Sequence, residues 1–240
     1  MLAVIGGSGW ETWSSFQASR DMSVDTPYGA TSAVIQLGTI NHQPVAFLSR
    51  HGPAHNLAPH QINYRANIWA LKALGVTRIL AINAVGGIHA SMGPEALIVP
   101  DQIIDYTWGR AHSFWSDQVM HVDFSKPFEG ALRRQLVALS QSRRLGLIDF
   151  GVYGCTQGPR LESAAEIQRL KRDGCDLVGM TAMPEASLAR ELNVDYASLC
   201  ISVNWAAGLS EQCITMDAIF AILNETRPMV QGLIEGLAAD

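Results

Sequence analysis

Short runs of consecutive apolar residues alternate along the chain with segments in which apolar residues recur every three or four positions. The short runs predict strands that are buried on both faces, and the spaced pattern predicts amphipathic helices. We predict strands at 2–5, 33–36, 45–48, 78–83, 150–156 and 195–204. We predict helices from near Pro59 to Ala73, over 163–172, over 184–191 and close to the C-terminus, where Pro228 should kink or divide the last helix.

Strands that alternate with helices are typical of an α/β layer fold. No linker, repeat or long charge run divides the 240 residues, so we expect a single domain over 1–240. Apolar residues make up 48% of the chain and charged residues 16%, which is enough to bury a core and excludes a disordered protein.

The charge and the cysteines narrow the classes of partner. A net charge of −5 gives no overall basic character, so we expect neither nucleic acid nor a membrane surface as a partner. The start, MLAVIGGSGW, is more typical of a first strand than of a signal peptide, and no apolar run is long enough for a membrane span. The four cysteines lack metal-ligand spacing, so we expect reduced thiols in a cytoplasmic protein without a bound metal.

Glycines and polar residues follow the predicted strands, at the sheet edge where α/β proteins bind ligands. Gly6-Gly7-Ser8-Gly9 would expose backbone N–H groups and a hydroxyl, as phosphate-binding turns do, although this motif taken alone favours a plain tight turn. Arg50 and His51 follow the third strand and suit an oxyanion, with a surface ion pair as the alternative. Together with Asn83-Ala84 and Thr181 they predict one phosphate pocket built from four segments.

Two further polar residues stand at element ends. Glu162 comes where a strand gives way to a helix, and Asn204 ends an apolar strand, where an unpaired amide would be costly. Each residue taken alone also fits a purely structural role. Glu162 would stabilise a helix N-terminus, and Asn204 would be a core amide with its hydrogen bonds satisfied.

Several motifs in the same order resemble the trimeric nucleoside phosphorylases, and specifically their methylthioadenosine/methylthioinosine phosphorylase branch. They are SRHGPAHNLAPHQINYRANIWALKALGVTRILAINAVGGI, IVPDQIIDYT, GPRLESAAEI and GMTAMPEASLARELNVDYASLCISVN. The resemblance covers most of the chain, from the GGSG turn to the last helix. It implies a single α/β domain around a mixed, barrel-like sheet flanked by helices, assembled as a homotrimer.

The resemblance also implies the chemistry and the ligands. Inorganic phosphate would be the co-substrate, with no metal or organic cofactor, and it would displace a purine from C1′ of a ribosyl group. Residues that correspond to the phosphate site are Ser8, Arg50, His51, Thr181 and, through its backbone, Ala84. Met180 would pack under the ribose, with Asn83 beside it and Leu161 at the base, where an aromatic residue usually stacks.

The base-reading positions favour a 6-oxopurine. Adenine-specific members resemble this chain except that they carry Asp at the positions of Asn204 and Ala206 and Ser at that of Glu162. Hypoxanthine offers N1–H to a carboxylate and O6 or N7 to an amide, whereas adenine would leave both groups mismatched at a cost of a few kcal/mol. We therefore predict Glu162 and Asn204 as the catalytic, base-reading pair.

The residues expected near the 5′ position of the sugar favour a methylthio group over a hydroxyl. Members that act on ordinary nucleosides place a His near the start of the last helix, where this chain has Met216, whose thioether suits an apolar group. His121 resembles a residue that reaches the 5′ pocket of a neighbouring subunit. The combined prediction is phosphorolysis of S-methyl-5′-thioinosine to hypoxanthine and 5-methylthioribose 1-phosphate.

Four alternatives remain at this point. A methylthioadenosine phosphorylase is disfavoured by Glu162 and Asn204, and an inosine/guanosine phosphorylase by the missing His near Met216. A nucleosidase would have little use for Arg50 and the rest of the anion site. A non-catalytic dinucleotide-binding module would need G-x-G-x-x-G, which the GGSG turn does not supply.

Overall fold

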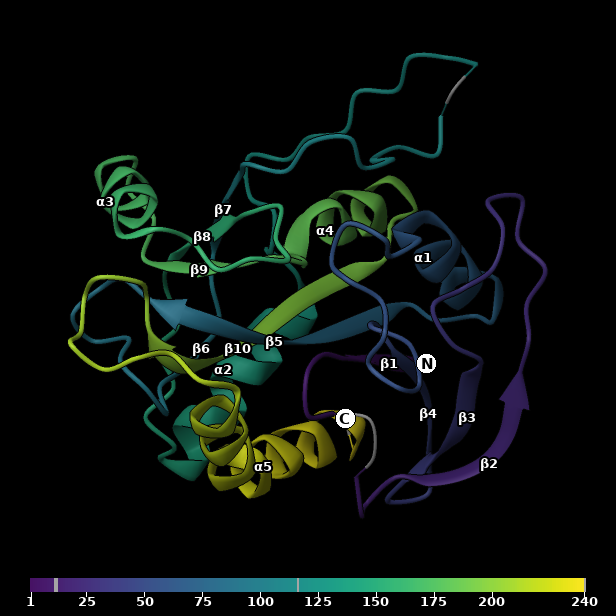
Figure 1. The fold of residues 1–240 in the computed structure, drawn as a ribbon. Coiled ribbons are helices and arrows are strands. Elements are labelled where there is room, and N and C mark those ends of the chain that lie inside the picture. The colour runs from purple at the N-terminus through teal and green to yellow at the C-terminus, as the bar shows by residue number, and fades with distance from the viewer. Residues whose placement is uncertain (11–12, 116, 240) are drawn as a thin grey trace.

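One mixed β-sheet runs through the centre of the protein and carries helices on both faces, as the computed structural model in Figure 1 shows. The structure describes residues 1–10, 13–115 and 117–239. The strands are β1 (Leu2–Gly6), β2 (Gln17–Met22), β3 (Ile35–Ile40), β4 (Gln43–Ser49), β5 (Arg78–Gly87), β6 (Leu97–Ile98), β7 (Gln102–Asp105), β8 (Val152–Cys155), β9 (Leu177–Gly179) and β10 (Asp195–Trp205). The helices are α1 (Tyr64–Ala73), α2 (Ala131–Arg143), α3 (Ala164–Arg172), α4 (Ala182–Glu191) and α5 (Met216–Ala239).

The sheet branches at β5. Its main path runs β2-β3-β4-β1-β5-β9-β8-β7, while β10 pairs with β5 along nearly its whole length and also with the short β6. Strands β4, β1, β5 and β10 are mutually parallel, and β2, β3 and β9 supply antiparallel pairs. The parallel strands therefore end at one edge, where loops from several parts of the sequence meet.

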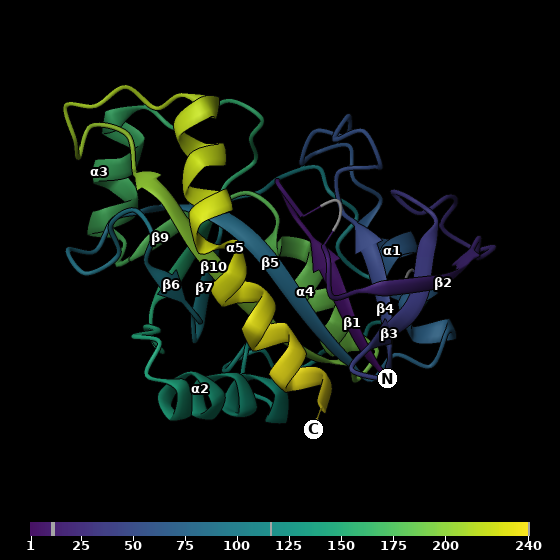
Figure 2. The same cartoon turned by 90° about the horizontal axis from the view of Figure 1, so that it is seen from below.

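Both faces of the central strands are buried, which explains their continuous apolar sequences. In β1, Ala3 and Ile5 belong to the hydrophobic cluster on one face, whereas Leu2 and Val4 belong to the cluster on the other. Helices α1 and α4 contribute to the first cluster, and α2 and α5 cover the second face (Figure 2). The expected α/β fold with a central mixed sheet flanked by helices is confirmed.

Helix starts follow local capping chemistry. The Asn63 side chain accepts from the backbone of Ala66 at the start of α1, and Ser163 forms a capping box with Glu166 at the start of α3. Helix α2 has only Gly130 at its N-cap, and its Leu132 N–H is bound instead by the Asp195 carboxylate at the start of β10.

Several predicted boundaries are wrong. Pro59 precedes α1 and lies outside it, because the cap is Asn63. Strand β5 extends to Gly87, four residues past its predicted end, and β2, β6, β7, β9 and α2 were not predicted. Pro228 was expected to kink or divide the last helix: the axis of α5 bends along its length (Figure 2), and the helix is not divided but continues through Pro228 to Ala239.

The segment between β7 and α2 extends away from the sheet, at the top of Figure 1. Its exposed apolar side chains include Trp108, Val119 and Met120. None of the helices in the parts of the chain that the structure describes is long and apolar enough to cross a membrane.

Candidate active site

A pocket of about 450 Å³ opens where β1, β4, β5, β9 and β10 end. Its lining includes the residues that the sequence predicts for phosphate, Ser8, Arg50, His51, Ala84 and Thr181, and we call their part of the pocket the phosphate end. It also includes residues predicted for the nucleoside, Asn83, Leu161, Glu162, Met180, Asn204 and Met216, and we call their part the nucleoside end. Segments that are up to about two hundred residues apart in sequence thus meet at the edge that parallel topology predicts.

Arg50 is buried at the phosphate end and is held on two sides. Its Nε and Nη2 donate to Oε1 and Oε2 of Glu185 at 2.8 and 2.9 Å, and its Nη1 donates to the Ile82 carbonyl at 2.9 Å. Burial alone would lower the pKa of Arg50, but the Glu185 carboxylate outweighs it, and the pKa is raised. A guanidinium carries five N–H groups, so two remain for a ligand in the pocket.

His51 lines the same end as a neutral side chain. Its Nδ1 lies 2.8 Å from the Leu57 carbonyl, and its ring packs 4.7 Å from that of His55, centroid to centroid. Burial, and then the nearby charge of Arg50, lower the pKa of His51 to about 4. At neutral pH the ring therefore carries no charge.

The glycine turn brings Ser8 into this end of the pocket. A Cβ on Gly7 would lie 2.6 Å from the Ile82 carbonyl oxygen and 3.0 Å from Arg50 Nη1, so only glycine lets the turn pass this close. The Ser8 hydroxyl lies 3.4 Å from His55 Nε2. Of the two interpretations from sequence, a tight turn and an anion cradle, the structure is compatible with both at once, since Trp10 N–H closes the turn on the Gly7 carbonyl.

Asn83 and Thr181 are joined to each other and to β10. The Thr181 hydroxyl donates to Asn83 Oδ1 at 3.1 Å, and Asn83 Nδ2 donates to the Ser198 hydroxyl at 2.6 Å. All three side chains are buried, so this chain of hydrogen bonds fixes the position of Thr181 at the start of α4.

Glu162 and Asn204 lie at the nucleoside end. The Thr156 hydroxyl donates to Glu162 Oε1 at 2.6 Å, which orients the carboxylate and leaves Oε2 open. Asn204 follows an irregularity in the pairing of β10 with β5, and its Nδ2 donates to the Trp205 carbonyl at 2.7 Å. One Nδ2 hydrogen and Oδ1 of Asn204 remain for a ligand.

The rim of the pocket is apolar. Leu161 is 47% exposed and Met216 55% exposed, although both line the cavity. Met180 lies deeper, and Ile214 and Ile219 stand beside Met216. A ligand that filled this end would cover apolar surface that water now contacts, which is favourable.

Sequence reasoning missed Arg110, which reaches into the loops around the nucleoside end. Its guanidinium donates to the carbonyls of Met180 and Met183 at 2.8 and 2.6 Å and to those of Thr156 and Gln157 at 3.3 and 2.9 Å. It thereby joins the loop beside Glu162 to the loop that carries Met180. It also donates to the side chains of Gln157 and Tyr64, both at 3.2 Å. No motif marks Arg110, because most of its partners are main-chain carbonyls; the one signal is an arginine within an otherwise uncharged stretch.

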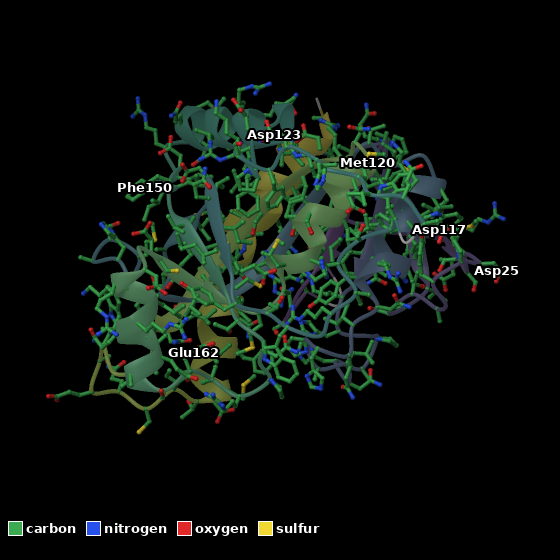
Figure 3. The ribbon with its side chains drawn as sticks, turned by 90° about the horizontal axis from the view of Figure 1, so that it is seen from above. Asp25, Asp117, Met120, Asp123, Phe150 and Glu162 are labelled. Carbon is green, nitrogen blue, oxygen red and sulfur yellow. The ribbon has the colours of Figure 1, made fainter. Side chains whose placement is uncertain are left out.

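His121 does not line the pocket of its own chain. It lies next to Met120, which Figure 3 shows far across the molecule from Glu162. The described ranges contain no group of three or more His, Cys, Asp or Glu side chains arranged to hold a metal ion.

Comparison with known proteins places the chain among phosphorylases. Residues 1–235 match the Phosphorylase superfamily. The chain is 53% identical to a probable S-methyl-5′-thioinosine phosphorylase of Pseudomonas syringae pv. tomato, over 94% of this chain and 93% of that protein. It is 41% identical to the 6-oxopurine nucleoside phosphorylase of Pyrococcus furiosus, over 97% and 90%. The methylthioadenosine phosphorylase of Schistosoma mansoni in complex with adenine superposes with a TM-score of 0.94 at 30% identity, covering 99% of this chain and 90% of that one.

Proposed function

Because the chain belongs to the phosphorylase superfamily, we propose that it catalyses the phosphorolysis of S-methyl-5′-thioinosine to hypoxanthine and 5-methylthioribose 1-phosphate. It is an enzyme of the nucleoside phosphorylase type, and phosphate is its co-substrate. The observation that carries the choice of base is the presence of a carboxylate and a carboxamide, Glu162 and Asn204, in one pocket.

The base would be read by complementary hydrogen bonds. Hypoxanthine presents N1–H as a donor, which suits the open Oε2 of Glu162, and O6 and N7 as acceptors, which suit the Asn204 amide hydrogen. Adenine has no hydrogen on N1. Its N1 and the Glu162 carboxylate would therefore face each other with lone pairs and with no hydrogen to share. A buried mismatch of this kind disfavours adenine by about a hundredfold or more.

The reaction would proceed without a covalent enzyme intermediate. An oxygen of phosphate attacks C1′ as the bond from C1′ to the base nitrogen breaks, and the electron pair of that bond leaves with the base. The hydrogen bond from Asn204 would stabilise the negative charge that grows on the purine. Arg50, Ser8 and the Ala84 backbone would hold the phosphate below C1′, with Thr181 lining the same end, so that positioning supplies much of the rate.

The sugar would lie between these two ends. Met180 supports the ribose, with Asn83 bound to Thr181 beneath it, and Leu161 packs on the base without aromatic stacking. Met216 on the apolar rim suits a methylthio group, which gains by burial, better than a hydroxyl, which would lose water.

We propose that residues 1–240 form one domain and that three copies assemble as a homotrimer in the cytoplasm. The exposed apolar side chains of the segment between β7 and α2 support a subunit interface there, since such side chains are costly to leave in water. In that assembly His121 would contribute to a neighbour's 5′ pocket. The four free cysteines, three of them buried, are compatible with a reducing compartment.

The test is a phosphate-dependent assay of methylthioinosine, methylthioadenosine and inosine side by side. A preference of at least roughly a hundredfold for methylthioinosine over methylthioadenosine is expected. A preference for methylthioadenosine would contradict the roles of Glu162 and Asn204, and a preference for inosine would contradict the role of Met216. Nucleoside cleavage at a rate that does not depend on phosphate would indicate a nucleosidase.

A further inference from the structure

His51 lines the phosphate end of the pocket as a neutral ring, where a positive or hydrogen-donating group would be expected. A carbonyl oxygen can only accept, so the contact of 2.8 Å with Leu57 means that Nδ1 carries the ring hydrogen. In a neutral imidazole the other nitrogen, Nε2, is then an acceptor. The pKa of His51 is lowered to about 4 by burial and by Arg50, so the ring is neutral at physiological pH.

Nε2 is also available. Within the described residues it makes no hydrogen bond, and the His51 ring lines the pocket at the end that holds Arg50 and Ser8. The neighbouring His55 ring packs against it at a tilt of 33°, with the centroids 4.7 Å apart.

The surrounding charges do not simply favour the most negative anion. The charge of Arg50 is matched by Glu185 in a buried pair. The Thr181 hydroxyl gives its hydrogen to Asn83, so it too turns an oxygen lone pair toward other partners. An anion oxygen without hydrogen would therefore meet the lone pair of His51 Nε2 with nothing to share.

We propose that His51 is a specificity-determining residue that accepts a hydrogen bond from a P–OH group, so that the pocket selects tetrahedral oxyanions that carry a hydrogen. This inference rests on the proposed function, because it concerns the co-substrate of the same site. Phosphate and arsenate carry a hydrogen at neutral pH. Sulfate has the same shape and the same double negative charge as hydrogen phosphate but carries none, and fluorophosphate dianion likewise carries none.

The experiment compares these four anions by calorimetric titration of the purified protein in the presence of hypoxanthine. We expect phosphate and arsenate to bind within about threefold of each other, and sulfate and fluorophosphate to bind at least about tenfold more weakly, as a lost hydrogen bond to an ion predicts. Sulfate binding within about threefold of phosphate would overturn the proposal.

The substitution H51Q separates the hydrogen bond from simple anion attraction. A glutamine amide can donate to any oxyanion, so the gap between phosphate and sulfate should shrink to about threefold or less, whatever the loss in absolute affinity. The matched control is H89Q, since His89 lies on the surface, where its Nδ1 contacts Ser91, and it should leave the gap unchanged. A gap that persists in H51Q would overturn the proposal.

A second measurement does not depend on a folded variant. Heteronuclear NMR of side-chain-labelled histidine in the unmodified protein with phosphate bound should show His51 with hydrogen on Nδ1 and none on Nε2. A doubly protonated ring would overturn the proposal. Methylthioinosine cleavage is measured on the same samples. Cleavage together with equal binding of sulfate and phosphate would contradict this inference alone. The absence of phosphate-dependent cleavage of any nucleoside would contradict the proposed function.

Discussion

Arg50 and Glu185 form a two-bond ion pair in the interior, with Nε 2.8 Å from Oε1 and Nη2 2.9 Å from Oε2. Arg160 and Glu166 form a two-bond pair at the surface, through Nη1 and Nη2 of the arginine, with both bonds at 2.8 Å. The exposed fractions of the side chains are 1% and 0% in the first pair and 72% and 45% in the second. The two pairs thus share the number and length of their hydrogen bonds and differ most in their access to water, which makes each a control for the other.

Substitution of Glu185 by Gln should strongly destabilise the protein. It leaves the Arg50 charge buried without a counterion, and it also changes the acceptor of the Tyr196 hydroxyl, which lies 2.9 Å from Glu185 Oε2. We expect the free energy of unfolding in urea to fall by about 3 kcal/mol or more.

The control for that substitution is Glu166→Gln. Glutamine retains the capping bond to Ser163, and water screens the remaining Arg160 charge. A loss below about 1 kcal/mol is expected. Equal losses in the two variants would mean that burial does not govern the strength of these pairs.

The sequence predicts the parts of the fold whose burial is uniform. Strands β1, β4, β5 and β10 were found because both faces are covered and nearly every central position is apolar. Strand β2, with the sequence QASRDM, is almost wholly exposed and has no apolar run to find. Helix α2 buries only Leu132, Leu136 and Ser140, so its weak apolar face was missed, and β9 has only three residues.

The site follows the same rule. Residues at the ends of predicted strands, such as Arg50 and Asn83, are recognisable because strand ends form the ligand edge of such sheets. Glu185, Thr156 and Arg110 were not predicted to take part. Their contribution depends on which distant segments they meet, and for Arg110 four of the partners are carbonyls, which every residue possesses. Such contacts leave no pattern in a single sequence.

Asn204→Asp should shift the base preference toward adenine. A carboxylate would accept from the amino group of adenine but would repel O6 of hypoxanthine, and it would also lose the bond that Nδ2 donates to the Trp205 carbonyl. We expect lower overall activity, and a ratio of kcat/KM for methylthioinosine to that for methylthioadenosine that falls by at least about tenfold.

Addition of Ala206→Asp and Glu162→Ser should move that ratio further in the same direction, because it completes the pattern of the adenine-specific relatives. Asn224→Asp, on the exposed side of α5, is the control and should leave the ratio unchanged. An unaltered ratio in Asn204→Asp would show that this side chain does not read the base.

His51 should make the protein less stable in acid. The pKa of the folded-state ring is about 4, below the ordinary value of 6.5, so between these values the unfolded chain binds a proton that the folded chain does not. Stability is therefore lost as the pH falls from 6.5 toward 4, by at most about 3 kcal/mol. The measurement is the difference in urea unfolding free energy between the protein and His51→Gln at several pH values. Every other titratable group is present in both proteins, so parallel curves of unfolding free energy against pH would contradict the lowered pKa of His51.

Arg110→Lys should raise KM for the nucleoside and lower kcat while leaving KM for phosphate nearly unchanged. A lysine ammonium has three hydrogens on one atom and cannot span the carbonyls of Thr156, Gln157, Met180 and Met183, so the loops on either side of the base and ribose would shift relative to each other. At a site that works by positioning, a shift of about 1 Å between such loops reduces kcat/KM by about tenfold to a hundredfold. The matched control is Arg133→Lys. Arg133 also binds main-chain carbonyls, those of Val99, Pro100 and Asp149, but it lies outside the pocket.

Both substitutions should lower stability, and only Arg110→Lys should alter nucleoside kinetics. If the two variants lose nucleoside affinity equally, or if Arg110→Lys weakens phosphate as much as nucleoside, the role of Arg110 is general stability and the positioning of these two loops is not its function.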